Sequence, residues 1–160
     1  DAILNNSKNP IHDARLHAML LYRTPESLTA KFNSERNDNQ NSYKVESWLL
    51  HHGEKLTGRF ELSAYKLMNH LLKTIGENTT ENDLQEFAKI STTKIHQIAI
   101  NSDYFFAPNE NIKTHNLLSS ITNNLSYHEI NSIHGHDAFL IEYERLNNIL
   151  KTIFNTKHTN

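Results

Sequence analysis

Apolar positions in the first ninety residues follow the spacing of amphipathic helices. One series repeats at intervals of three and four residues, as side chains on one helix face do: Val45, Trp48, Leu49, His52 and Leu56. Ser42 is expected to cap that helix. Thr24-Pro25-Glu26 is expected to start an earlier helix, because a hydroxyl, a proline and a carboxylate each favour a helix N-terminus.

Two further helices are expected before residue 90. Ser63 can cap a helix with several apolar side chains, and Thr79, Thr80 and Asp83 can start a short amphipathic one. Residues 33–41 are polar and lack periodicity, so they predict a loop. Residues 1–90 are therefore predicted to form a helical region without a sheet of its own.

The pattern changes in residues 91–160, where short strands alternate with helices. Residues 95–100 and 127–130 predict strands, and residues 109–122 and 137–154 predict helices. This order is typical of two parallel strands joined by a right-handed crossover. The predicted fold class is therefore α/β, with parallel strands and crossover helices preceded by a mostly helical region.

Composition limits the classes of function. The chain has 160 residues, with 16 Lys and Arg against 18 Asp and Glu, and this near-neutral balance gives no electrostatic case for nucleic acid or a membrane surface. The absence of cysteine excludes disulfides and thiolate catalysis. No apolar run approaches the roughly 20 residues of a membrane span, and no signal peptide opens the chain, so a cytoplasmic location is expected.

The candidate chemistry lies after the two predicted strands. Asp103 follows the first strand and His136 follows the second, and ligands of open α/β sheets bind beyond the carboxyl ends of the strands. A carboxylate and an imidazole would meet there, which is the arrangement that orients a catalytic general base. The residues alone leave simpler roles open, since Asp103 can form an Asx turn and Asp137 can cap a helix.

Local sequence narrows these alternatives. Four segments stand out along the chain: residues 14–28, residues 45–60, residues 102–108 (SDYFFAP) and residues 135–140 (GHDAFL). Together the four segments resemble the homoserine O-acetyltransferase family of the α/β-hydrolase superfamily. The resemblance implies the C-terminal half of that fold, with residues 1–90 as the helical lid and residues 91–160 as part of the core.

The resemblance also implies roles for single residues. Asp103 matches the acid and His136 the base of a Ser–Asp–His triad. Arg15 matches an arginine that binds the carboxylate of the amino-acid substrate, Asp137 the acid that receives its ammonium group, and Tyr22 a tyrosine that lines the pocket. The implied reaction moves an acetyl group from acetyl-CoA to the hydroxyl of L-homoserine, in methionine biosynthesis. Acetyl-CoA would be a substrate, with no metal or bound cofactor, and the lid helices would form a homodimer.

The sequence departs from this family in one essential respect. It contains no G-x-S-x-G elbow and no glycine-rich oxyanion loop. In the order Ser, Asp, His, the nucleophile would lie upstream of residue 1, in an N-terminal half of the same fold. The chain by itself is therefore predicted to be inactive. A succinyl donor and a serine acceptor both remain open, and His134 stands where the family more often has an aromatic residue.

Two other classes of function are compatible with parts of the sequence. The chain could be a non-catalytic interaction module with vestigial catalytic residues. It could also be a metal-dependent hydrolase that uses His134, His136 and Asp137, with His51-His52 as further ligands. The second is disfavoured because adjacent residues need a special backbone to converge on one ion, and because no H-E-x-x-H motif occurs.

Overall fold

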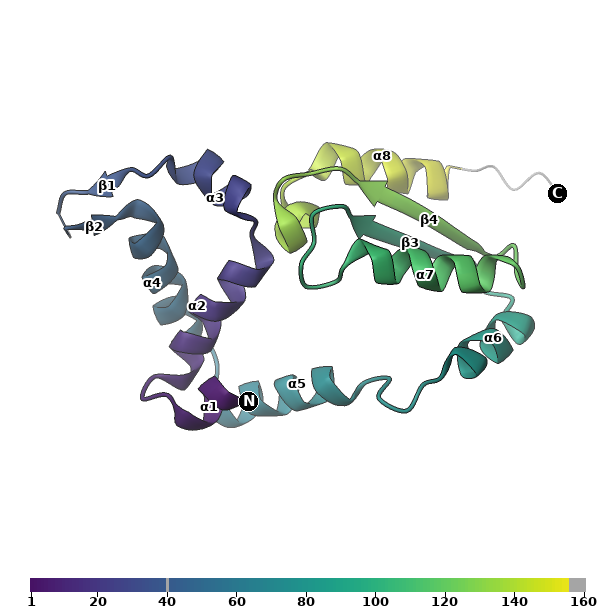
Figure 1. The fold of residues 1–160 in the computed structure, drawn as a ribbon, viewed down its shortest axis with the longest axis horizontal. Coiled ribbons are helices and arrows are strands. Elements are labelled where there is room, and N and C mark those ends of the chain that lie inside the picture. The colour runs from purple at the N-terminus through teal and green to yellow at the C-terminus, as the bar shows by residue number, and fades with distance from the viewer. Residues whose placement is uncertain (40, 156–160) are drawn as a thin grey trace. The chain divides into compact units, whose positions relative to one another are not determined.

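A computed structural model of the protein describes residues 1–39 and 41–155 (Figure 1). Gln40, which falls in the predicted loop, and residues 156–160, which end the predicted second region, lie outside the described residues. No helix in the described part of the chain is long and apolar enough to cross a membrane.

The chain divides into two compact units, and each is described by itself. The helical unit comprises Asp1–Leu21 and Pro25–Asn78, and the strand unit comprises Tyr22–Thr24 and Thr79–Asn160. Three residues from the N-terminal part of the sequence, Tyr22 to Thr24, thus belong with the C-terminal part. The helix at residues 81–90, expected with the first region, also lies in the strand unit.

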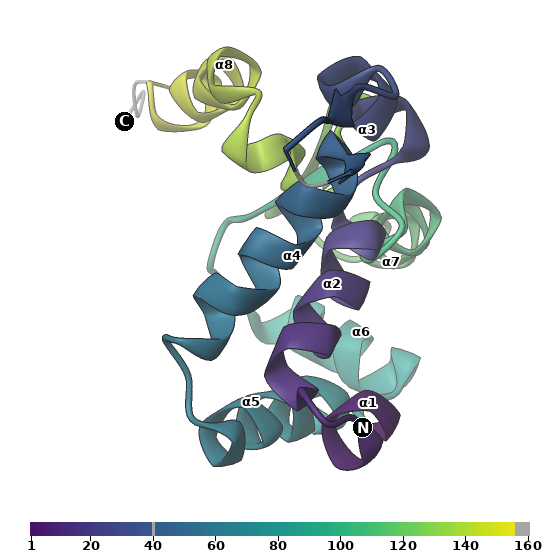
Figure 2. The same ribbon diagram turned by 90° about the vertical axis from the view of Figure 1, so that its left-hand side faces the viewer.

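The helical unit contains short helices and one small ribbon (Figure 2). Its elements are α1 (Ala2–Asn6), α2 (Pro10–Tyr22), α3 (Pro25–Phe32), β1 (Arg36–Asn37), β2 (Ser42–Tyr43), α4 (Lys44–Thr57) and α5 (Leu62–Thr74). Helix α3 begins at the predicted proline. The expected loop 33–41 instead contributes β1, which pairs antiparallel with β2.

Two predicted caps are wrong in this unit. Ser42 lies in β2, and Tyr43 is the residue that precedes the first turn of α4. The Ser42 hydroxyl is instead 3.1 Å from that of Ser47, inside the first turn of that helix. Ser63 lies within α5, whose N-cap is Glu61. The helix starts are thus displaced from the predicted serines, by one residue at Ser42 and by two at Ser63.

Gly53 is the position where α4 meets α2. A Cβ atom built on Gly53 would lie 2.4 Å from the ring of His12 and 2.6 Å from the Leu16 side chain. Figure 2 shows α2 and α4 running beside each other. The absence of a side chain at Gly53 therefore allows the two helices to approach closely.

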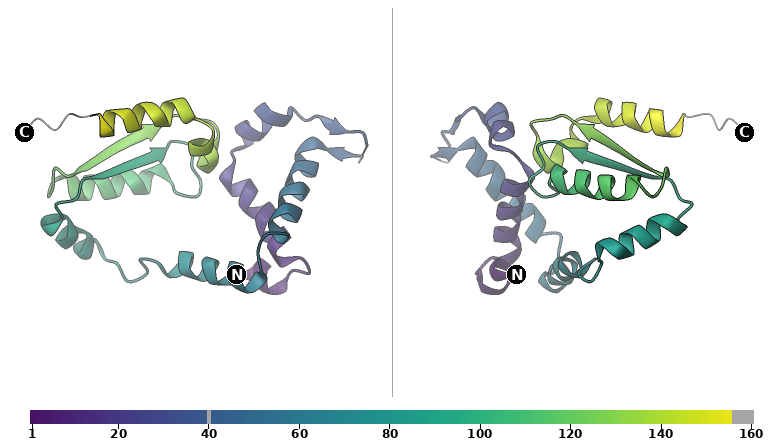
Figure 3. Two further views of the ribbon diagram at one scale, coloured as in Figure 1. Left: turned by 180° about the vertical axis from the view of Figure 1, so that it is seen from behind. Right: turned by 45° about the vertical axis from the view of Figure 1, so that its right-hand side comes forward.

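The strand unit holds one parallel strand pair between helices. Its elements are α6 (Glu81–Ile90), β3 (Ile95–Ile100), α7 (Pro108–Ser119), β4 (Leu125–Ile130), the 3₁₀ helix η1 (Gly135–Leu140) and α8 (Tyr143–Phe154). β3 and β4 pair in parallel, as predicted. The pairing covers six residues, from Ile95 opposite Leu125 to Ile100 opposite Ile130, so β4 begins two residues before the predicted strand 127–130. Helices α7 and α8 lie on opposite faces of the pair (Figure 3).

The cap predicted for α6 is confirmed. The Asp83 backbone N–H donates to the Thr80 hydroxyl at 3.2 Å, and the Asp83 carboxylate accepts from the Thr80 backbone N–H at 2.8 Å. This reciprocal pair is a capping box, which satisfies two N–H groups that a helix start leaves open.

The single helix predicted over residues 137–154 is wrong. The chain forms the 3₁₀ turn η1, breaks at Ile141, and starts α8 with Glu142 as its N-cap. Gly135 opens this stretch with φ of +65°, which a glycine adopts without strain. Asp137 does not cap a helix, because its carboxylate pairs with the Arg23 side chain.

The core of the strand unit fixes the ends of both strands. Ile100, Ile130 and Ala138 form a buried cluster, and Ile98, Leu146 and Ile149 pack against it. Ala138 is fully buried and lies two residues after His136. The same cluster therefore anchors the last residues of both strands and the turn that carries the candidate base.

Candidate active site

The structure brings Asp103 and His136 together, as the sequence predicted. β3 ends at Ile100 and β4 ends at Ile130, opposite each other in the register, so the loops that follow leave the same edge of the sheet. Nδ1 of His136 lies 2.8 Å from Oδ2 of Asp103. This distance is that of a strong charge-assisted hydrogen bond from the imidazole to the carboxylate.

The Asp103 carboxylate uses its two oxygens for different purposes. Oδ1 accepts the backbone N–H groups of Phe105, at 2.7 Å, and Phe106, at 2.9 Å, while Oδ2 faces His136. Asp103 is 6% exposed, so these contacts are largely shielded from water. The Asx turn that seemed a rival interpretation thus coexists with the His136 contact, and it orients the free oxygen of the carboxylate.

Asn101 and Ser102 join the acid loop to the His136 loop. The Ser102 hydroxyl accepts the N–H of Gly135 at 3.0 Å and donates to the carbonyl of Ser132 at 2.6 Å. The N–H of Ser132 donates to the Asn101 side chain at 2.8 Å. Sequence reasoning missed both residues, although short polar side chains that precede a candidate acid in a turn were the available signal.

Four aromatic rings surround the imidazole of His136. The centroid of its ring lies 5.1 Å from that of Tyr22, 5.2 Å from Phe105, 5.3 Å from Phe106 and 5.7 Å from Phe139. The His136 side chain remains 20% exposed. The rings therefore limit water around the imidazole while leaving part of it accessible to a reactant.

Tyr22 and Asp137 both lie in this neighbourhood, but Asp137 has a partner that the sequence did not reveal. Nε of Arg23 is 3.0 Å from Oδ2 of Asp137, and these side chains are 14% and 17% exposed. Arg23 was overlooked because nothing in its sequence context distinguishes it from a solvated arginine. Its one signal was its place directly after the candidate residue Tyr22.

Arg15 lies on α2, in the helical unit, and is described with that unit. There it is close to His52 of α4. Burial first, and then the positive charge of Arg15, lower the pKa of His52 below its usual value. The substrate-binding role expected for Arg15 stays a prediction.

The residues named for a metal site have other partners. His136 contacts Asp103, and Asp137 contacts Arg23. Over residues 1–39 and 41–155, no three His, Asp or Glu side chains gather in a way that could hold a metal ion.

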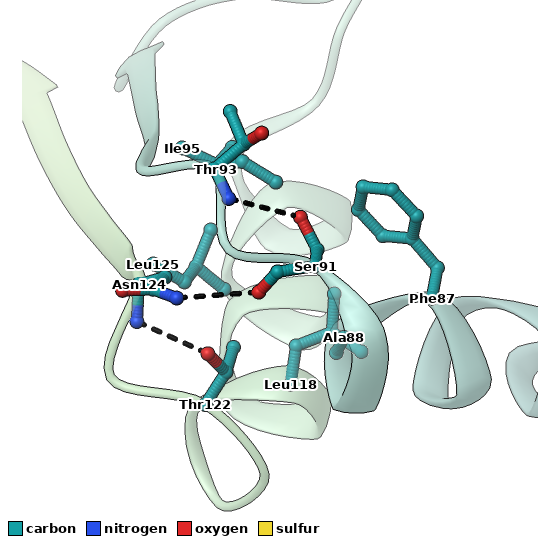
Figure 4. A pocket seen from close by; sticks show the side chains of 9 residues that line it. All are labelled: Phe87, Ala88, Ser91, Thr93, Ile95, Leu118, Thr122, Asn124 and Leu125. Atoms are coloured by element: carbon teal, nitrogen blue, oxygen red, sulfur yellow. Dashed lines mark hydrogen bonds between the residues drawn. The ribbon is translucent and has the colours of Figure 1, made fainter.

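A small apolar hollow lies at the other end of the strands (Figure 4). Ile95 and Leu125, the first residues of β3 and β4, line it together with Phe87, Ala88 and Leu118. Polar groups at its rim bond to one another: Asn124 Nδ2 donates to the Ser91 carbonyl at 3.2 Å (Figure 4). This hollow is formed by packing of α6 and α7 and is separate from the candidate active site.

Comparison with known proteins agrees with the motifs. No model of a known protein family matches the chain. A homoserine O-acetyltransferase of Methanococcus vannielii is 30% identical over 151 residues, which are 90% of this chain and 30% of that protein. One of Nostoc punctiforme is 33% identical over 144 residues, 86% of this chain and 39% of that protein. A homoserine O-succinyltransferase of a Janthinobacterium species is 26% identical over 157 residues, 92% of this chain and 40% of that protein.

The fold has a counterpart among solved structures. A crystal structure of a mutant of esterase E22 superposes with a TM-score of 0.69, at 16% identity, over 94% of this chain and 47% of that one. That identity supports similarity of fold alone. The chain spans 30–40% of the length of these curated relatives. Its sequence is similar to part of the homoserine O-acetyltransferases, as its motifs predicted.

Proposed function

We propose that the chain supplies the acid and base of a Ser–Asp–His triad in an enzyme that transfers an acetyl group from acetyl-CoA to the hydroxyl of L-homoserine. The observation that carries the proposal is the 2.8 Å contact between Nδ1 of His136 and Oδ2 of Asp103 at the carboxyl ends of two parallel strands. The relatives named homoserine acyltransferases supply the substrate class. In this proposal the reaction belongs to methionine biosynthesis and takes place in the cytoplasm.

The contact sets the protonation state that a general base needs. When Nδ1 carries the proton that is donated to Asp103, the lone pair on Nε2 of His136 is available to accept another. In the first half-reaction Nε2 would take the proton of a serine hydroxyl as that oxygen bonds to the thioester carbonyl carbon. The carbon–sulfur bond then breaks, and the departing CoA sulfur takes the proton from the imidazolium and leaves as the thiol.

The serine is proposed to lie outside these 160 residues, because no G-x-S-x-G elbow occurs in the sequence. In the second half-reaction the homoserine hydroxyl is the nucleophile and the serine oxygen is the leaving group. Nε2 of His136 would take the proton of the homoserine hydroxyl as that oxygen bonds to the acyl carbon, and the serine oxygen would leave with the proton. No metal or bound cofactor is required, since acetyl-CoA is itself the donor.

Three residues are proposed to bind the acceptor amino acid. The guanidinium of Arg15 would hold its carboxylate, since a planar fork of donors suits two-point contact with a carboxylate. The carboxylate of Asp137 would receive its ammonium group, and Tyr22 would line the pocket beside His136. The 5.1 Å separation of the Tyr22 and His136 rings supports the last of these roles.

A succinyl donor is the second candidate, and the Janthinobacterium relative named homoserine O-succinyltransferase favours it. The test combines the chain with a nucleophile-bearing N-terminal half and measures CoA release with each pairing of acetyl-CoA or succinyl-CoA with homoserine or serine. The proposal expects fast release only with acetyl-CoA and homoserine together. Equal release with succinyl-CoA would contradict the assignment of acetyl-CoA as the donor and favour the second candidate. No release with any pairing would favour a non-catalytic interaction module.

A further inference from the structure

We infer that Tyr22, Arg23 and Thr24 are positioning residues that hold the His136 imidazole in its working orientation. These three consecutive residues, called the 22–24 clamp below, contact the His136 loop on both sides of the histidine. The inference rests on the proposed function of His136. It adds Arg23 and Thr24, which act on the loop and not on a reactant, and gives Tyr22 a positioning role besides its proposed place in the pocket.

The first contact precedes the histidine. The hydroxyl of Thr24 donates to the backbone carbonyl of Ile133, across a separation of 109 residues in sequence. Thr24 is 1% exposed and Ile133 is 47% exposed, so this hydrogen bond is partly buried. Only a residue with a side-chain donor at position 24 can make it, and Thr24→Val would leave the Ile133 carbonyl without this partner.

The second contact is between backbones. A Cβ atom on Gly135 would lie 2.8 Å from the carbonyl oxygen of Tyr22, a backbone atom that cannot move aside as a side chain can. Gly135 also has φ of +65°, which disfavours other residues. The backbone of the clamp therefore packs directly on the residue that precedes His136.

The third contact follows the histidine. Nε of Arg23 lies 3.0 Å from Oδ2 of Asp137, with both side chains more than four-fifths buried. A shielded ion pair constrains its partners more than an exposed one, because water screens it less. The ring of Tyr22 meanwhile lies 5.1 Å from that of His136 itself.

These contacts supply a constraint that Asp103 cannot provide. A single hydrogen bond at Nδ1 of His136 fixes one atom but leaves the ring free to rotate about that bond. Anchors at Ile133, Gly135 and Asp137 fix the backbone from which the ring extends, so Nε2 stays directed at one place. Misplacement of a catalytic group by about 1 Å can cost on the order of 10²-fold in rate.

The test is NMR spectroscopy of the 160-residue chain with ¹⁵N-labelled histidine, at alkaline pH. In the wild type we expect His136 to give one tautomer, protonated at Nδ1, with ring protons shifted upfield by the neighbouring aromatic rings. Arg23→Gln and Thr24→Val should each cause loss of the single-tautomer signature and of part of the upfield shift. Arg23→Lys should retain more of both than Arg23→Gln, because it keeps the charge.

Matched controls lie in the same unit. Arg145→Gln removes an ion pair in which Arg145 Nε, on an exposed side chain, lies 3.4 Å from Oε2 of the partly buried Glu142. Thr152→Val removes a hydroxyl that donates to the Asn148 carbonyl at 3.0 Å. Both should leave the His136 signals unchanged. Wild-type His136 signals in Arg23→Gln and in Thr24→Val would overturn the inference.

Other outcomes are equally decisive. Loss of the amide signals of His96 in β3 and His128 in β4 in Arg23→Gln, with a normal spectrum for Arg145→Gln, would assign the clamp to holding the fold and would also overturn the inference. No substrate is present in this experiment. If the chain shows the expected His136 signals but its combination with a nucleophile-bearing N-terminal half fails in acyl transfer, that result would contradict the proposed function and leave the clamp in place.

Discussion

At the scale of single residues, the two oxygens of Asp103 have different partners, and this predicts the effect of replacing Asp103 by asparagine. Asp103→Asn would place an NH₂ group opposite Nδ1 of His136, since the other oxygen position is held by two backbone N–H groups. The imidazole would then accept at Nδ1 and carry its proton on Nε2, the wrong tautomer for a base. In the complete enzyme, kcat should fall by about 10⁴-fold.

The control for this substitution is Asp83→Asn, which alters the capping carboxylate of α6 in the same unit. It should change stability slightly and leave kcat near the wild-type value. A similar loss in both variants would mean that Asp103 acts on stability and not on the imidazole.

His52 gives a pH dependence with a defined sign. Burial, followed by the charges of Arg15, His51, Lys31 and Lys55, lowers its pKa in the folded chain. The unfolded chain then binds more protons as pH falls below about 6.5, so the contribution of His52 to stability is fully present above that value and is lost as pH falls through the folded pKa. Urea titrations at several pH values should show this loss, and His52→Gln should flatten it.

His17→Gln is the matched control, because the His17 side chain is exposed on α2. His52 also lies 4.7 Å, centroid to centroid, from the ring of Trp48, so its replacement should lower stability somewhat at every pH. The slope of stability against pH is therefore the informative quantity. An unchanged slope in His52→Gln would contradict the assignment.

At the scale of elements, the turn that carries His136 depends on Gly135. Gly135→Ala should lower the free energy of unfolding by about 1–3 kcal/mol, because alanine is strained at φ of +65° and its Cβ would meet the Tyr22 carbonyl. Gly58→Ala is the control, since the nearest atoms would lie 3.8 Å away and Gly58 has φ of −72°. Equal effects in the two variants, measured by urea unfolding, would contradict this account of the turn.

The strand pair and its order were predictable from sequence, and the turn after β4 was not. The β-branched run Ile95–Ile100 and the intervening helix identify a parallel crossover. The continuous apolar pattern after Asp137 suggested one helix. A local pattern holds no information on long-range contacts, such as the ion pair between Asp137 and Arg23. Ser42 failed as a cap for a similar reason, since it pairs in a ribbon that local propensity does not reveal.

In the candidate site, too, the acid and base were predictable from sequence, whereas the residues that support them were not. The positions of Asp103 and His136 followed from the rule that ligands bind beyond the carboxyl ends of parallel strands. The residues that support them, Ser102, Arg23 and Thr24, act through contacts of 33, 114 and 109 residues in sequence, which no local pattern encodes.

At the scale of the whole molecule, α5 presents an apolar surface that invites self-association. Every residue of this helix is at least partly exposed. Five large apolar side chains on it or directly after it are more than half exposed: Leu67, Met68, Leu71, Leu72 and Ile75. We expect the chain to form homodimers through residues 12–75. We expect Trp48 or Leu49 near the contact. Trp48 packs on Phe32 within its own unit, at 5.5 Å between ring centroids.

Sedimentation velocity measures this association directly. Leu71→Glu should shift the chain towards monomer, because it places a charge in the apolar surface, whereas Lys66→Glu on the same helix should not. A wild-type chain that stays monomeric at high concentration would contradict the prediction, as would a dimer that survives Leu71→Glu unchanged.

The central claim is that this chain contributes the acid and base, but not the nucleophile, of an acyltransferase. CoA release from acetyl-CoA in the presence of homoserine tests it most directly, measured for the purified chain alone and after addition of a nucleophile-bearing N-terminal half. The account predicts background release by the chain alone, fast release by the combination, and a return to background with His136→Ala. Fast release by the chain alone, abolished by His136→Ala, would contradict it, because the nucleophile would then lie within these 160 residues.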